Sequence, residues 1–387
     1  MVARIASGKK SGEDAAPAAG RKVLESILAE ADIRIDGDRP WDIQVREPGF
    51  YRRVLSEGSL GLGEAYMDGW WDAEELDVFF YRLLRARADR RQRVNGRLIL
   101  NWMAARCLNP QSRRRSKRVA EAHYDLGNRF YERMLDPRMQ YTCAYWKTAD
   151  DLASAQEAKL DLVCRKLKLR EGDEVLELGG GWGGFAKFAA EHYGCSVTVY
   201  NISAEQVAYA RKICEGLPVE IWEADYREAT GSYDKVVSIG MCEHVGAANY
   251  GAFFQLQRRV LKSEGLMLLH TIGGEESKRT NDPWFAKYIF PGGQLPSLRQ
   301  LTGASEALFT LEDFHKIGAD YDPTLMGWHR NFEHHWPEFR EAYGERFYRM
   351  WRYYLLSCAG SFRARRLHLW QLVFSPYGVE GGYEPVR

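Results

Sequence analysis

The sequence predicts an α/β fold, in which a doubly wound, Rossmann-like sheet follows a small and mostly helical N-terminal domain. First, strand-like and helix-like segments alternate after about residue 119, a pattern typical of a parallel sheet covered by helices. Second, a run of glycines directly follows one of these strands and precedes a helix. Third, the 387-residue chain is 45% hydrophobic and 28% charged. This composition excludes a disordered or collagen-like protein and allows one large domain plus a smaller one.

The N-terminal part divides into a tail and a domain. Residues 1–21 are small, polar and rich in alanine, so we expect a flexible tail. We assign residues 22–97 to a small N-terminal domain. Its expected elements are, in order, a helical pattern over 23–33, a short strand within 40–48, a helix with Phe50, Tyr51, Val54 and Leu55 on one face, a glycine-punctuated aromatic stretch over 58–72 and an apolar segment that begins at residue 77.

Two basic clusters flank an apolar segment at the start of the connector, which we place at residues 98–121. Seven arginines lie between Arg82 and Arg97, and the second cluster consists of Arg113, Arg114, Arg115, Lys117 and Arg118. The apolar segment between them carries Trp102. Such a combination suits an anionic membrane surface, where each basic side chain contributes about 1 kcal/mol. The alternative is a solvated helix face.

The second domain is expected over residues 122–387. Its predicted strands are 173–179, 196–202, 219–225, 233–241 and 266–273, and its predicted helices include 185–193, 204–216 and 250–265. In such a sheet a ligand binds beyond the carboxyl ends of the strands.

Charge, hydropathy and cysteine usage restrict the partners. Lysine and arginine (54) nearly cancel aspartate and glutamate (53), which argues against a general nucleic-acid binder. The sequence has no run of about 18 apolar residues and no signal-peptide pattern. The seven cysteines form no CxxC pair. We therefore expect a reduced cytoplasmic protein without a metal site, peripheral on the inner face of the membrane.

The glycine loop at residues 179–184 reads GGGWGG and fits G-x-G-x-x-G, a motif shared by nicotinamide, flavin and S-adenosylmethionine proteins. A dinucleotide fold places an acidic residue at the end of the second strand, whereas this strand ends in Tyr200 and Asn201. Asp225 instead follows the third strand, and Glu177 lies at the end of the first. This placement favours S-adenosylmethionine over NAD, and a nicotinamide oxidoreductase remains the less favoured alternative.

Several long motifs resemble those of the cyclopropane-fatty-acyl-phospholipid synthases, within the mycolic acid cyclopropane synthase superfamily. They are HYDLGNRFYERMLDPRMQYTCAYW, VLELGGGWGGFA, MCEHVG, LLHTIG, KYIFPGGQLPS, GADYDPTLMGW and CAGSFRARRLHLWQLVFS. The segment EGSLGLGEAYMDGWWD also resembles the additional N-terminal domain of the phospholipid-acting members. The resemblance implies a class I methyltransferase domain, a homodimer, and transfer of a methylene from S-adenosylmethionine to the cis double bond of an unsaturated phospholipid.

The resemblance also implies a bound bicarbonate as base. The residues carried over to hold this anion are Cys143, Glu243, His270, the backbone N–H of Ile272, and Tyr321. Each of three side chains has a structural alternative: Cys143 as a small buried hydrophobe, His270 as a core histidine and Glu243 as a helix cap. Cys358 matches a cysteine once considered a nucleophile. We expect no thiolate attack, because the alkene itself attacks the methyl group, and the adjacent Ala359 and Gly360 suggest tight packing.

We expect ten residues to bind the cofactor: Tyr141, Thr142, Glu177, Gly179, Gly181, Gly183, Ser203, Gln206, Asp225 and Tyr226. Two positions depart from the family pattern, which usually has cysteine where Gly180 stands and aspartate where Glu177 stands. Two further functions stay open. The enzyme could form methylene- or methyl-branched chains, or the chain could be a non-catalytic lipid-binding relative.

Overall fold

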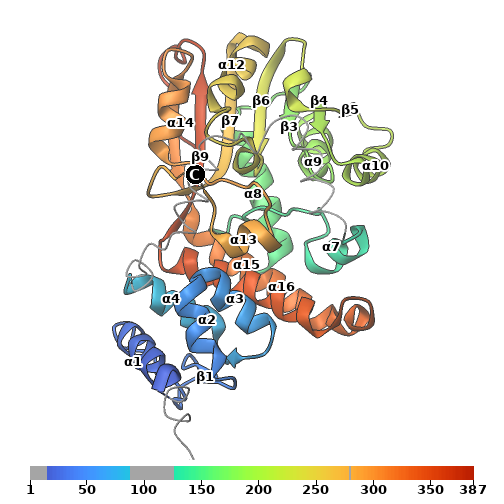
Figure 1. Cartoon of the computed structure of the whole chain (residues 1–387). Coiled ribbons are helices and arrows are strands. Elements are labelled where there is room, and N and C mark those ends of the chain that lie inside the picture. The colour runs from blue at the N-terminus through green and yellow to red at the C-terminus, as the bar shows by residue number, and fades with distance from the viewer. Residues whose placement is uncertain (1–14, 88–125, 279) are drawn as a thin grey trace, which may run out of the picture.

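The computed structural model describes residues 15–87, 126–278 and 280–387. A seven-stranded sheet with helices on both faces forms the upper part of the molecule in Figure 1, and the N-terminal helices lie below it. The strand order is β5-β4-β3-β6-β7-β9-β8. The strands are β3 (Glu174–Leu178), β4 (Ser196–Asn201), β5 (Val219–Glu223), β6 (Tyr233–Ile239), β7 (Leu261–Gly274), β8 (Thr310–Lys316) and β9 (Leu367–Ser375).

The five predicted strands are confirmed, and the purely parallel sheet is wrong. Strands β3 to β7 pair in parallel, whereas β9 runs antiparallel to both β7 and β8. The predicted helix over 250–265 is too long, because α12 (Tyr250–Val260) ends where Leu261 pairs with Tyr233 on β6. A Cβ on Gly265 would lie 2.8 Å from the carbonyl oxygen of Asp234. The absence of a side chain at residue 265 therefore allows this pairing.

The other helices of the second domain position the site or cover the sheet. They are α7 (Asn128–Met134), α8 (Leu152–Lys166), α9 (Gly184–Tyr193), α10 (Ala204–Ile213), α11 (Cys242–Val245), α13 (Pro283–Tyr288), α14 (Leu298–Ser305), α15 (Tyr321–His335) and α16 (Arg340–Arg363). Helix α16 carries a kink at Gly344, whose φ of 72° is left-handed, and it runs between the sheet and the N-terminal helices (Figure 1).

The N-terminal region contains α1 (Ala15–Ala29), α2 (Gly49–Glu57), α3 (Ser59–Met67) and α4 (Leu76–Arg85), with a small pair of strands, β1 (Gln44–Val45) and β2 (Trp71–Asp72). Helix α1 begins at Ala15, so the predicted flexible tail extends too far, and residues 1–14 lie outside the described structure. Leu55 was predicted on the buried face of α2 but is exposed. The basic residues of 88–121, including Arg113, Arg114 and Arg115, also lie outside the described residues.

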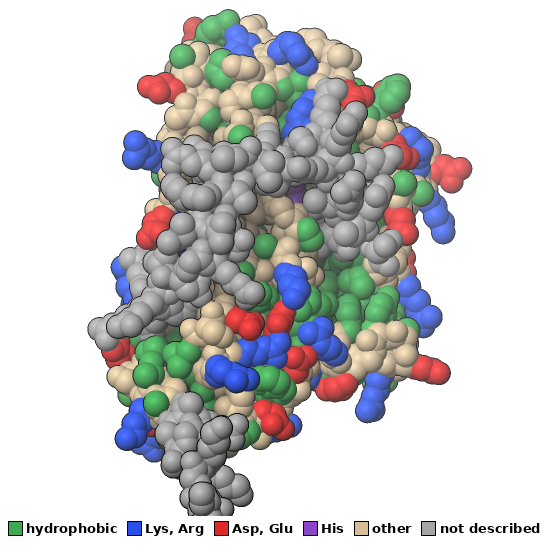
Figure 2. Space-filling view, viewed as in Figure 1, with side chains coloured by type: hydrophobic (Ala, Val, Ile, Leu, Met, Phe, Trp, Pro, Cys, Tyr) green, Lys and Arg blue, Asp and Glu red, His purple; other side chains and the backbone are tan. Residues whose placement is uncertain are grey.

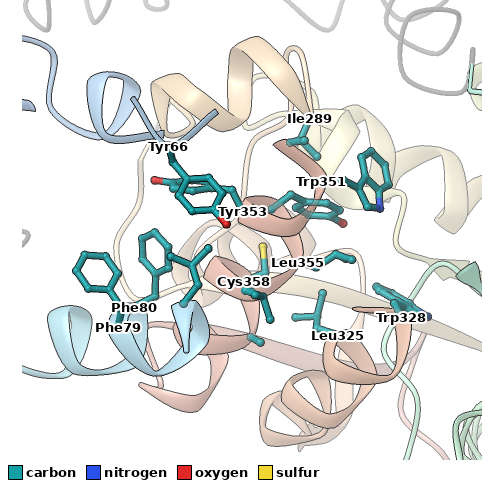
Figure 3. Packing of buried hydrophobic residues seen from close by; sticks show 14 of the residues in the cluster. Tyr66, Phe79, Phe80, Ile289, Leu325, Trp328, Trp351, Tyr353, Leu355 and Cys358 are labelled. Atoms are coloured by element: carbon teal, nitrogen blue, oxygen red, sulfur yellow. The ribbon is translucent and has the colours of Figure 1, made fainter. Parts of the chain in front are cut away.

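The N-terminal helices pack against the second domain through one shared hydrophobic cluster. Tyr66 and Phe80 contact Tyr353 of α16, with ring centroids 5.5 and 5.1 Å apart. Figure 3 shows these rings beside α16, next to Cys358. Gly360 lets α16 approach α4 closely, since a Cβ there would lie 2.5 Å from the carbonyl oxygen of Asp77.

Charged side chains surround this apolar contact. Glu64 on α3 accepts hydrogen bonds from Lys287 Nζ (2.5 Å) and Tyr288 Oη (2.8 Å) of α13. It also pairs with Arg53, 2.7 Å away, and Arg346 of α16 pairs with Asp68 at 3.0 Å. Figure 2 shows basic and acidic side chains side by side on this lower part of the molecule. The N-terminal helices are therefore tied to α13 and α16 by both burial and charge.

Candidate active site

A pocket lies at the carboxyl ends of β3, β4 and β6, where the sequence predicted it. The pocket is lined by nine of the ten residues predicted to bind the cofactor: Tyr141, Thr142, Glu177, Gly179, Gly181, Ser203, Gln206, Asp225 and Tyr226. Gly183 is not among the residues that line the pocket, and its predicted contact with the cofactor stays a prediction. It precedes α9 with a φ of 84°, and a Cβ there would lie 2.9 Å from Cβ of Ala210. Gly183 therefore serves the close packing of α9 against α10.

The glycine loop turns tightly over the end of β3. Gly179 (φ 83°) and Gly181 (φ 52°) both adopt left-handed backbone conformations, which residues with a Cβ rarely do. A Cβ on Gly180 would lie 2.3 Å from Val199 and 3.1 Å from Oε2 of Glu177. The two departures from the family pattern are thus neighbours, because the longer carboxylate of Glu177 lies beside the position that lacks a side chain.

Glu177 presents a buried carboxylate to the pocket. Burial raises its pKa to about 8, against the opposing effects of Lys159 and the backbone N–H of Ala186 in the first turn of α9. Its Oε2 is buried and has no hydrogen-bond partner within the described structure. A buried acceptor without a partner is costly, and a ligand that donates a hydrogen bond would satisfy it. The amino group of an S-adenosylmethionine molecule fits this acceptor.

The far wall of the pocket carries the predicted neutral and acidic groups. Ser203 caps α10 by accepting from the backbone N–H of Gln206, and Gln206 Oε1 accepts from Asn201 Nδ2 at 3.0 Å. Asp225 pairs with Arg227, 2.9 Å away. The ring of Tyr226 lies between the Arg227 guanidinium and Phe253. This wall therefore combines an aromatic face with a carboxylate, which suits a purine.

The segment before α8 supplies the other wall and leads into an aromatic cluster. The Tyr141 hydroxyl donates to the Tyr354 hydroxyl at 2.9 Å. The Tyr141 ring packs on Trp328, and Trp328 packs edge-to-face on Tyr321, which in turn stacks on Phe362 at 4.4 Å. Trp328, Tyr321, Tyr354 and Phe362 are all buried. Tyr141 therefore joins the pocket wall to a buried cluster of aromatic rings.

Glu243 lies on the short helix α11, near Tyr321 of this aromatic cluster, whose pKa it helps to raise. Its Oε1 accepts the backbone N–H of Ile272 at 2.6 Å, whereas its Oε2 is buried without a partner among the residues described. Burial raises the pKa of Glu243 to about 7. The sequence predicted that the Ile272 N–H would face an anion, and this is corrected because that N–H donates to Glu243. The cap alternative for Glu243 also fails, since its side chain bonds β7 and makes no cap hydrogen bond to α11.

His270 on β7 is fully buried and neutral, because burial lowers its pKa well below the usual value. The Gln371 side-chain amide lies 3.3 Å from its Nδ1. With that amide donating, the ring proton lies on Nε2. Within the described part of the chain Nε2 has no partner. His270 therefore offers a donor and Glu243 an acceptor, two groups that a bicarbonate ion could satisfy.

Tyr321 and the two cysteines complete the predicted set. The pKa of Tyr321 is raised by burial and by the nearby Cys143, Glu243, Tyr141 and Cys358, so the structure brings these residues together. Burial also raises the pKa of both thiols, and neither is a thiolate at neutral pH. Cys143 donates to the carbonyl oxygen of Ala144 at 3.3 Å. Cys358 lies in the apolar interface with the N-terminal helices (Figure 3), as its packing neighbours predicted.

Sequence reasoning missed many residues of the pocket wall. They are Met139, Gln140, Gly180, Trp182, Phe185, Tyr200, Asn201, Ile202, Ala224, Arg227, Ile239, Gly240, Met241, His244, Val245, Pro291 and Gly292. It also missed Lys159, which lies behind the pocket and is fully buried. One signal could have found this lysine: residues 155, 159, 162 and 166 follow helical spacing on one side of α8, and Ala155 and Leu162 mark that side as buried.

Two further features of the described residues bear on function. No group of three or more histidine, cysteine, aspartate or glutamate side chains there could hold a metal ion. None of the described helices combines the length and the hydropathy that crossing a bilayer requires.

The strand order, with an antiparallel β9 between β7 and β8, and the glycine-loop pocket define a class I S-adenosylmethionine-dependent methyltransferase. The mycolic acid cyclopropane synthase CmaA1, in its complex with SAH and CTAB, is 31% identical to this chain. The match has a TM-score of 0.63 and covers 67% of this chain and 97% of that one.

The family model described as mycolic acid cyclopropane synthetase matches residues 111–372. The cyclopropane-fatty-acyl-phospholipid synthase of Escherichia coli (strain K12) is 51% identical over 366 residues, which are 95% of this chain and 96% of that protein. The tuberculostearic acid methyltransferase UfaA1 of Mycobacterium tuberculosis is 29% identical over 409 residues, covering 96% and 93%. The chain belongs to the mycolic acid cyclopropane synthetase family.

Proposed function

We propose that this enzyme adds a methylene from S-adenosylmethionine across the cis double bond of an unsaturated phospholipid acyl chain, giving a cyclopropane fatty acid. One observation carries the proposal. The wall of the cofactor pocket joins a buried aromatic cluster at Tyr141, and the predicted site residues Glu243 and His270 each carry a buried polar atom without a partner in the described structure. The similarity to the Escherichia coli phospholipid synthase supports the substrate class.

The chain's own residues suit this reaction. When bound, S-adenosylmethionine supplies an electrophilic methyl group. Tyr141, Trp328 and Tyr321 present aromatic faces beside the pocket. Such faces stabilise positive charge that develops on the acyl chain, by about 2 kcal/mol where water is excluded.

A bicarbonate ion is the base that fits the remaining groups. His270 Nε2 would donate to it, Glu243 Oε2 would accept its hydroxyl proton, and Tyr321 would offer a third contact. The bound ion supplies a base that a methyl donor does not readily alkylate. Assays in carbon-dioxide-free buffer, with bicarbonate added back, test this part. Turnover that is unchanged without bicarbonate would contradict it.

The product decides between the proposal and its alternatives. The purified protein is incubated with S-adenosylmethionine and vesicles of a monounsaturated phospholipid, and S-adenosylhomocysteine is quantified. Mass spectrometry of the lipid should show the mass of one added CH₂, and proton NMR should show upfield cyclopropane signals. A protein that forms no S-adenosylhomocysteine, yet binds the vesicles, would instead be a lipid-binding relative.

A second candidate, favoured by the similarity to tuberculostearic acid methyltransferase UfaA1, is formation of a methylene- or methyl-branched chain. Loss of a different proton from the same methylated cation would give an unsaturated branched chain, with a methylene branch where a hydride shift comes first, whereas a saturated methyl branch also requires a hydride donor. The lipid would gain the same mass in the methylene case, but its NMR spectrum would lack the upfield ring signals.

Membrane contact and dimerisation complete the proposal. The basic residues Arg113, Arg114 and Arg115 suit an anionic lipid surface. Replacing all three by serine should weaken co-sedimentation with anionic vesicles, most strongly at low salt, and unchanged co-sedimentation would make the cluster a solvated face. Light scattering on the eluting protein tests the homodimer.

A further inference from the structure

Lys159 is a buried cation behind the cofactor pocket that the proposed reaction does not use. It lies on α8 and is fully buried. Its Nζ donates to Gln140 Oε1 at 2.6 Å and to Thr142 Oγ1 at 2.8 Å. Gln140 and Thr142 both line the pocket, on either side of Tyr141. A single ammonium group therefore holds both neighbours of Tyr141 in the pocket wall.

A neutral side chain on the same helix face makes a parallel contact. Gln156, one turn earlier on α8, donates from Nε2 to the carbonyl oxygen of Thr142 at 2.8 Å. An uncharged donor thus suffices to hold the backbone of this segment. Burying an ammonium costs far more than burying an amide, so holding the wall does not by itself explain a lysine at position 159.

The groups that face Lys159 explain its charge. They are Asp136 after α7, Cys143, Glu177 on β3 and His270 on β7. Burial lowers the pKa of Lys159 to about 8, and its acidic neighbours oppose that shift. Glu177 is the neighbour that lines the pocket. The other groups that face Glu177 are Cys164 of α8, Cys214 after α10 and the backbone N–H of Ala186. Of these neighbours within the described structure, Lys159 alone carries a full positive charge.

We propose that Lys159 is a positioning residue for the cofactor: its ammonium fixes Gln140 and Thr142 in the pocket wall and places a positive charge behind the buried Glu177 carboxyl group that faces the amino group of S-adenosylmethionine. The inference rests on the proposed function only for the identity of the cofactor. The hydrogen bonds of Lys159 go to two residues of the cofactor pocket, so its removal acts first on cofactor binding. Because the two buried groups interact, they titrate as a coupled pair.

The test measures S-adenosylmethionine binding by calorimetry as a function of pH. Without the ammonium, Glu177 stays protonated to higher pH, since burial then acts unopposed. Lys159→Met should therefore raise the Kd at neutral pH by at least about tenfold. It should also shift the midpoint of the pH dependence, at which half of the affinity is gained, to a higher pH. Lys159→Arg keeps a positive charge and should leave that midpoint close to the wild-type value.

Gln156→Leu is the matched control, because it removes a neutral contact to the same Thr142. It should weaken binding by a similar factor at every pH and leave the midpoint in place. Lys159→Met could also prevent folding. The double variant Lys159→Met/Glu177→Gln removes both buried charges, which a buried site tolerates better than one unpaired charge. It should bind the cofactor weakly, without the pH dependence of the wild type.

Two results would overturn the inference. One is a Lys159→Met variant with the wild-type Kd and midpoint, while the wild type binds the cofactor and forms product. The other is a double variant that keeps the wild-type pH dependence. A wild-type protein that does not bind S-adenosylmethionine would instead refute the proposed function, and the inference with it.

Discussion

Glu243 is the side chain on which the proposed chemistry depends most. One of its oxygens bonds Ile272, and the other is buried without a partner among the described residues. Glu243→Gln keeps the size of the side chain and removes its capacity to hold a proton. We expect kcat/KM to fall by about a hundredfold or more, whereas the Kd of S-adenosylmethionine stays within about twofold. Equal losses in turnover and cofactor binding would contradict this role.

The raised pKa of Glu243 also predicts how stability depends on pH. Its pKa is about 7 in the folded protein, against 4.5 for a glutamate in water, so the folded state binds more protons than the unfolded chain between these values. Stability therefore falls as pH rises from about 4.5 through 7. Glu243→Gln removes this effect and should stabilise the protein at pH 8 by up to about 3 kcal/mol. Thermal unfolding at pH 5 and pH 8 checks it, since the gain should appear only at the higher pH.

A substitution at Cys358 tests whether its thiol serves packing or catalysis. Its thiol is buried in the interface with the N-terminal helices, and burial raises its pKa. Cys358→Ala should cost about 1 kcal/mol of stability through the small cavity it leaves, with kcat nearly unchanged. A variant that unfolds at nearly the wild-type temperature but has no turnover would refute the packing role.

At the scale of elements, the contact between α16 and α4 depends on Gly360. A Cβ at this position would lie within 2.8 Å of backbone atoms of Asp77 and Tyr81, which cannot move without shifting α4. Gly360→Ala should therefore destabilise the protein by about 2 kcal/mol. Gly251→Ala on α12 is the control, since no atom lies within 4 Å of its Cβ position. This control should stabilise by about 0.5–1 kcal/mol, and a drop of equal size in both variants would contradict the argument.

Local patterns predicted the elements whose partners are neighbours in the chain. Residues within one short segment predicted the strand, the glycine loop and the helix from β3 to α9. They also predicted the pocket at the ends of the strands. The antiparallel β9 did not, because it pairs with β7 across about a hundred residues and no local periodicity encodes that contact. The glycine-rich stretch that forms α3 was missed for a related reason. Gly63 allows Trp284 to approach within 2.3 Å of its Cβ position, a distant contact that outweighs low helix propensity.

In the candidate site, too, local motifs were predictable from the sequence and distant contacts were not. The motifs located Glu243, His270 and Tyr321, but the use of the Ile272 N–H depends on a contact between α11 and β7 that the sequence does not display. Lys159 was missed because a lysine in an amphipathic helix is normally exposed. Its buried position becomes evident only from its spacing to apolar neighbours.

At the scale of the whole molecule, one segment links the N-terminal domain to both halves of the site. Helix α13 contacts α3 through Trp284 and Gly63, and the residues after it include Pro291 and Gly292 of the cofactor pocket. Further on, the backbone N–H of Gln294 donates to the carbonyl oxygen of Glu243 at 2.7 Å. A change in how the N-terminal domain docks would therefore reach the pocket wall and the acid.

Glu64 is where this connection can be tested. Although burial raises its pKa, hydrogen bonds from Lys287, Tyr288 and Arg53 lower it to about 2. The stability that these bonds contribute is therefore present above pH 4.5 and is lost as pH falls toward 2. Glu64→Gln should cost about 2 kcal/mol at neutral pH and should lower kcat on vesicles more than it weakens S-adenosylmethionine binding, because α13 loosens. Glu191→Gln, which breaks only the exposed pair with Lys187, should change the unfolding temperature and kcat little. If Glu64→Gln lowered stability but left turnover on vesicles intact, docking of the N-terminal helices and shape of the site would be independent.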